Sequence, residues 1–112
     1  MKGCLAFMAL WMLVSAASAE EKVIVIPNDK LGQYVLIDKS GSAEERMIVV
    51  RRSGISGVVY SRRVYNCTED TVHFLGSGLT MEALDRDQIN WREQPVENDT
   101  VASDIERIAC NK

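Results

Sequence analysis

The sequence has few of the residues from which catalytic and metal sites are built. Its 112 residues include one histidine, His73, and three cysteines, none of them in a C-x-x-C pair. A zinc site needs several ligands, and a catalytic triad needs a partnered imidazole. Asp85-Arg86-Asp87 begins like a calcium loop, but the glycine that such a loop needs at its sixth position is missing. We therefore expect a protein that is not an enzyme, with no catalytic residue, no metal and no cofactor.

The chain also lacks an excess of basic residues and a long hydrophobic run. With 13 Lys and Arg against 16 Asp and Glu, its net charge of -3 does not favour nucleic acid as a partner. The apolar run from Leu5 to Val14 follows Lys2 and precedes the small residues Ala17-Ser18-Ala19. This pattern is typical of a cleaved signal peptide over residues 1–19. The alternative, a membrane-spanning helix, needs roughly 20 apolar residues.

Removal of that leader would leave residues 20–112 as a single small domain. We expect it to be exported by a bacterium, periplasmic or secreted, without membrane insertion after cleavage. Cys4 would leave with the leader, so that Cys67 and Cys110 remain. An even number of cysteines in an oxidising compartment favours a disulfide. In the chain-entropy treatment, closing a loop of that length stabilises the fold by about 4 kcal/mol.

Short β-branched and apolar runs separated by turn residues predict a curled antiparallel sheet of about six strands. We expect strands at 23–26, 34–37, 46–52, 58–67, 71–75 and 79–83. Because short turns join them, the strands should form a meander. Gly76-Ser77-Gly78 indicates a bulge or bend, and residues 85–94 should form a polar loop that Trp91 anchors to the body.

The C-terminal segment predicts a helix over residues 100–109, packed on the sheet and held there by the disulfide. Asn98, Asp99 and Thr100 offer capping side chains. One face carries Val101, Ile105 and Ile108, which we expect to anchor the helix to the sheet. The polar residues Ser103, Asp104, Glu106 and Arg107 are expected to face outward. The predicted fold is thus mainly β, with one C-terminal helix.

Three of the predicted strands are apolar at consecutive positions, so both faces of the sheet should carry hydrophobic side chains. One helix of about three turns can cover only one face. The other face must then close on itself, bind a partner or meet a second copy. We favour a homodimer through the uncovered face or a strand edge, with a strongly curled half-barrel as the alternative.

Paired arginines on two neighbouring strands are the most prominent charges. They are Arg51, Arg52, Arg62 and Arg63, and Tyr60 lies among them in the sequence. We favour cross-strand ion pairs, in which Arg62 and Arg63 lie near Glu44 and Glu45. The alternative is a basic binding patch for an acidic polymer or a host glycan.

Several short motifs of the second half occur in a fixed order. They are Tyr65-Asn66-Cys67, Trp91, Pro95-Val96, the helix from Thr100, and Ala109-Cys110. In this order they resemble the bacterial surface-adhesin protein E-like proteins, and the resemblance covers residues 58–110. It implies a small exported domain with a disulfide-tethered C-terminal helix, and the founding member is a dimeric adhesin that binds host matrix and serum proteins. We expect a binding protein for a host or envelope protein. A periplasmic structural or assembly factor and a small enzyme inhibitor that uses loop 85–94 are the alternatives.

Overall fold

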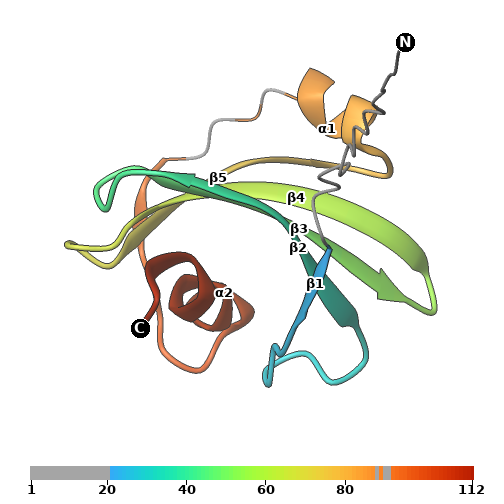
Figure 1. The fold of residues 1–112 in the computed structure, drawn as a ribbon, viewed down its shortest axis with the longest axis horizontal. Coiled ribbons are helices and arrows are strands. Elements are labelled where there is room, and N and C mark those ends of the chain that lie inside the picture. Colours follow the sequence, from blue (N-terminus) through green and yellow to red (C-terminus); the bar gives the residue numbers. More distant parts are fainter. Residues whose placement is uncertain (1–20, 88, 90–91) are drawn as a thin grey trace, which may run out of the picture.

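A computed structural model describes residues 21–87, 89 and 92–112 of the chain. Six antiparallel strands form one sheet in chain order, and two helices pack on it (Figure 1). The elements are β1 (Lys22–Ile24), β2 (Gln33–Gly41), β3 (Arg46–Gly54), β4 (Gly57–Asn66), β5 (Thr71–Gly78), α1 (Met81–Arg86), β6 (Gln94–Pro95) and α2 (Val101–Cys110). The predicted meander with a C-terminal helix is confirmed, and the sheet is curled and open. The predicted leader and the predicted Trp91 anchor lie outside the described residues.

The strand register assigns every side chain of the central hairpin to one of two faces, because residues directly opposite each other share a face. Ile48 lies opposite Arg63, and Val50 lies opposite Ser61. These residues share the face on which α2 packs, called the helix face from here on. Neighbouring positions such as Val49 and Arg62, which also lie opposite each other, occupy the outer face.

Burial of α2 against the helix face forms the main core. Ile105 and Ala109 are fully buried and belong to one cluster with Ile48, Val50 and Tyr65. Val101 and Ile108 also pack against this cluster and remain partly exposed. These contacts explain why the apolar stripe of the predicted helix turns toward the sheet.

The helix ends close to the predicted positions. Thr100 is the N-cap, and its side chain accepts from Ser103 N while the Ser103 side chain accepts from Thr100 N. The predicted C-terminal end at Ala109 is one residue short, since α2 extends to Cys110 and stops at Asn111 in the left-handed conformation. The disulfide between Cys67 and Cys110 is present, with 5.6 Å between their Cα atoms.

Two of the helix residues expected to face outward are buried instead. The Asp104 side chain is 1% exposed, and its Oδ2 accepts hydrogen bonds from the backbone N and the side-chain Nδ2 of Asn28. Glu106 is 8% exposed and lies near Lys112. The expectation was wrong because the β1–β2 loop and the C-terminal residue approach the polar side of the helix.

The predicted sixth strand at 79–83 is also wrong. Thr80 caps α1, since its hydroxyl accepts from Ala83 N, and helix-forming residues follow it. The short helix buries Leu84 completely. The sixth strand is instead β6, which pairs with Thr71 and Val72 at the edge of the sheet.

The two helices lie on opposite faces of the sheet (Figure 1). α1 packs against β4 and β5 on the outer face, and α2 packs against β3 and β4 on the helix face. The outer face is therefore partly covered by the chain itself, which the expectation of a single helix did not include. No helix in the described part of the chain is long and apolar enough to cross a membrane.

Candidate binding surfaces

Strand alternation divides the four paired arginines between the two faces. Arg51 lies opposite Tyr60 on the outer face, and Arg62 shares that face. Arg52 and Arg63 point to the helix face, because Arg63 lies opposite the core residue Ile48 and Arg52 opposite Tyr34. The five residues of the predicted patch therefore form two separate groups.

Three of these arginines form ion pairs with acidic residues outside β3 and β4. Arg51 Nη1 lies 3.0 Å from Glu21 Oε2, and Arg62 Nη2 lies 2.8 Å from Asp85 Oδ1. Arg52 Nε lies 2.6 Å from Asp29 Oδ2. The expected partners Glu44 and Glu45 are wrong, because Arg62 pairs with Asp85 instead and Arg63 donates to Ser61. The acids are supplied by the N-terminal segment, the β1–β2 loop and α1.

The Arg52 pair is the most strongly organised of the three. Asp29 also accepts a hydrogen bond from the Tyr34 hydroxyl at 2.7 Å. Hydrogen bonds from Arg52, and then from Tyr34, hold the pKa of Asp29 far below its usual value. Burial, followed by the hydrogen bond to Asp29, raises the pKa of Tyr34. This cluster fixes the β1–β2 loop against the helix face.

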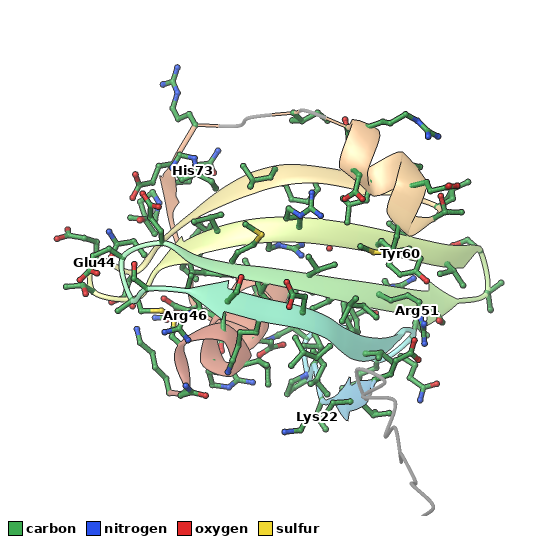
Figure 2. The ribbon with its side chains drawn as sticks, turned by 45° about the horizontal axis from the view of Figure 1, so that its top comes forward. Lys22, Glu44, Arg46, Arg51, Tyr60 and His73 are labelled. Atoms are coloured by element: carbon green, nitrogen blue, oxygen red, sulfur yellow. A yellow bond between two sulfur atoms is a disulfide. The ribbon has the colours of Figure 1, made fainter. Side chains whose placement is uncertain are left out.

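The tip of the β3–β4 hairpin exposes apolar side chains next to a stacked arginine. Ile55 at the turn is fully exposed, and 39% of both Val58 and Val59 is exposed. On the outer face the Arg51 guanidinium carbon lies 6.0 Å from the centroid of the Tyr60 ring. Arg51, Ile55, Val58 and Tyr60 are called the hairpin-end surface, whereas Val59 lies opposite Arg52 on the helix face. Figure 2 shows its labelled members Arg51 and Tyr60 at one end of the sheet.

The opposite end of the outer face is polar, and His73 and Glu44 mark it in Figure 2. His73 Nε2 lies 3.4 Å from Glu93 Oε1. The Thr71 hydroxyl donates to Glu93, and this bond, followed by that of His73, lowers the pKa of Glu93. Four of these polar side chains, Glu44, Glu45, His73 and Glu93, line a pocket of about 430 Å³. No cluster of His, Cys, Asp and Glu that could hold a metal ion occurs within residues 21–87, 89 and 92–112.

The helix face carries a second pocket, of about 340 Å³, at the β5–β6 edge. Val72, Phe74, Arg92 and Gln94 line it. Gln94 lies opposite Val72 in the register, and Phe74 lies opposite Arg63, so β4, β5 and β6 all contribute to this region. This pocket could not be predicted, because β6 begins at Gln94, the last residue of the predicted loop over residues 85–94.

Ionisable residues also surround the C-terminal end of α2. Lys112 pairs with Asp70, and its Nζ lies 3.5 Å from Glu106 Oε2. Burial, and then the hydrogen bond with Asp70, raises the pKa of Glu106. The hydrogen bond from Lys112 is the main cause that lowers the pKa of Asp70. This group lies beside the disulfide, so it belongs to the attachment of the helix.

Comparison of the chain with protein-family models, with curated proteins and with solved structures gave no match. The fold and the surfaces define a small antiparallel-sheet domain with a disulfide-tethered C-terminal helix. Its accessible features are an apolar hairpin tip and pockets with polar and aromatic walls.

Proposed function

We propose that this chain is an exported, non-enzymatic binding protein that recognises a host or envelope protein through the hairpin-end surface. The observation that carries the proposal is the full exposure of Ile55 at the hairpin turn, followed by the exposed Val58. Aromatic residues and arginine are enriched in protein interfaces, and Arg51 stacked on Tyr60 supplies both at the margin of this apolar group.

Two further observations support export. The disulfide between Cys67 and Cys110 belongs to the kind of bond that persists in the bacterial periplasm or outside the cell. The first 19 residues have the pattern of a cleaved leader. The ordered motifs that resemble the surface-adhesin protein E-like proteins agree with this location and with an adhesin-like role.

The experiment is affinity capture with the protein exported from its complete chain, against bacterial envelope extract and against host serum and matrix proteins. The double variant Ile55→Asp with Val58→Asp should lose the captured protein, because two carboxylates would have to be desolvated in the interface. Ala43→Asp is the control, since Ala43 is exposed in the turn between β2 and β3, at the other end of the sheet from Ile55. We expect it to retain capture.

Capture of the same protein by the double variant would overturn the assignment of the hairpin-end surface. Failure of the unaltered protein to capture any protein from the three sources would overturn the binding function itself. Circular dichroism and thermal melting of each variant confirm that a loss of capture does not result from unfolding.

A specific observation favours a second candidate, a periplasmic assembly factor that acts through a strand edge. β1 pairs only with Tyr34, Val35 and Leu36 of β2. Residues 38–41 of β2 pair with β3 on one side, and on the other side no strand in the described part of the chain pairs with them. An unpaired edge accepts a strand from another protein or from a second copy. We place the predicted homodimer at this edge.

A photo-crosslinking residue tests the two candidates side by side. Placed at Ser40, it should trap an envelope protein or a second copy if the β2 edge is used. Placed at Ile55, it should trap the partner of the hairpin-end surface. Light scattering at micromolar concentration should show a dimer if a second copy pairs with the β2 edge, and a monomer would exclude the homodimer at that edge.

A further inference from the structure

Arg63 differs from Arg51, Arg52 and Arg62 because no carboxylate of the described residues forms an ion pair with it. Its Nη1 donates to the Ser61 hydroxyl at 2.8 Å, and no acidic side chain of the described residues forms an ion pair with it. The groups whose charges act on it are the phenols of Tyr65 and Tyr34, which are neutral at pH 7. Arg63 thus carries an uncompensated positive charge on the helix face.

Burial makes that charge costly. Arg63 lies in the middle of β4, opposite the fully buried Ile48, and desolvation lowers the pKa of its guanidinium. Its remaining N–H donors are not among the buried, unpaired polar atoms of the described residues, so they reach accessible space. A partly desolvated guanidinium with free donors has the properties of an anion-binding group.

An aromatic ring connects Arg63 to the pocket on the same face. The Arg63 guanidinium carbon lies 5.4 Å from the centroid of the Phe74 ring. Phe74 also lines the pocket of about 340 Å³, together with Val72, Arg92 and Gln94. The volume falls in the lower part of the range for small-molecule sites, at roughly 300 to 1,000 Å³. The pocket therefore combines an apolar wall, an amide and the guanidinium of Arg92, and the guanidinium of Arg63 borders it across the Phe74 ring.

We propose that this pocket of the helix face binds a small organic carboxylate. Its carboxylate accepts hydrogen bonds from Arg63, and its apolar body lies on Val72 and Phe74. A carboxylate suits the site because its negative charge complements the positive charges of Arg63 and Arg92, and its two oxygens match the planar fork of a guanidinium. This site is separate from the hairpin-end surface and goes beyond the proposed protein-binding function.

The first test is a titration of the protein exported from its complete chain with 2-naphthoate, followed by NMR. We expect saturable shifts of the amides of Ser61, Arg63 and Phe74 and of the Arg63 side-chain Nε–H. The uncharged analogue 2-naphthalenemethanol tests the need for the charge, and inorganic phosphate tests the need for an apolar body. Both should bind at least about tenfold more weakly, because each lacks one of the two recognised features.

Variants then separate the charge from the fold. Arg63→Gln should weaken 2-naphthoate binding by about tenfold or more, and Arg63→Lys should weaken it less, because it keeps a charge but loses the fork. Arg86→Gln is the matched control, since it removes one positive charge from an exposed position on α1. If Arg63→Gln does not fold, the shift of the Arg63 Nε–H signal in the unaltered protein still shows whether 2-naphthoate contacts this side chain.

Two results would overturn the proposal. One is the absence of saturable 2-naphthoate binding to the unaltered protein at millimolar concentration. The other is binding that Arg63→Gln leaves unchanged or that moves signals away from β4 and β5. Neither result bears on the hairpin-end surface, whose test is the capture of a protein by the Ile55 and Val58 variant. The two proposals can therefore fail independently.

Discussion

Replacement of both bridged cysteines by serine should lower the free energy of unfolding by about 4 kcal/mol at 25 °C. Cys67 and Cys110 are 43 residues apart in the sequence. In the chain-entropy treatment the loss grows with the logarithm of that separation, and it comes from the greater freedom of the unfolded chain. Because small domains are stable by roughly 5 to 15 kcal/mol, the bridge supplies a large part of the total.

The native position of α2 should survive the loss of the bridge, because other bonds hold the helix. The Tyr65 hydroxyl donates to Ala102 O at 2.7 Å near its start. Lys39 Nζ donates to Ile108 O at 2.9 Å, and Arg46 Nη1 donates to Ala109 O at 3.1 Å near its end. We therefore expect the folded variant to keep the amide protection of the buried turn around Ile105.

Urea denaturation and hydrogen exchange measure these two expectations separately. With a denaturant slope of about 2 kcal/mol per molar, a loss of this size moves the urea midpoint down by about 2 M. A shift below about 0.5 M would refute the entropic argument. Helix amides that exchange freely while the strand amides stay protected would instead show that the bridge, and not the side-chain bonds, docks α2.

Three further predictions concern single side chains and can be measured by the same denaturation. Tyr65→Phe removes the hydrogen bond to Ala102 O and should cost about 1 to 3 kcal/mol, since the carbonyl loses its buried partner. The pKa of Glu106 is raised above its usual 4.5, so Glu106→Gln should gain stability relative to the unaltered protein as the pH rises above that value, and the gain should disappear at lower pH. The pKa of Asp29 is lowered by Arg52, so Asp29→Asn should be less stable at pH 7, with a difference that shrinks as the pH falls below the usual 3.8.

The sheet and α2 could be predicted because their signals are local. The β-branched runs separate cleanly at turn residues, and Thr100 precedes an apolar stripe with helical spacing. α1 also has a local signal, because Thr80 precedes the helix formers Met81 to Leu84. Its six residues are too few to show a period, and the meander pattern favoured a strand there.

The partners of the charged residues could not be predicted, because they depend on how loops approach the sheet. The buried carboxylate of Asp104 accepts its hydrogen bond from Asn28, which lies 76 residues earlier in the chain. Arg52 pairs with Asp29 and Arg62 with Asp85, and neither acid is on a strand that pairs with that arginine. Strand alternation predicts which face an arginine occupies, but only the folded loops decide whether its charge is neutralised there.

The register of the central hairpin links the core to both proposed binding surfaces. A slip of one residue would exchange the two faces of β4, so that Arg62 would enter the helix face and Arg63 would leave it. Burial of Tyr65 beneath α2, in the same cluster as Ile48 of β3, opposes such a slip, because the Tyr65 side chain would move to the outer face. The packing of α2 therefore directs Arg63 toward the Phe74 pocket, while the unpacked end of the same hairpin leaves Ile55 exposed for a partner.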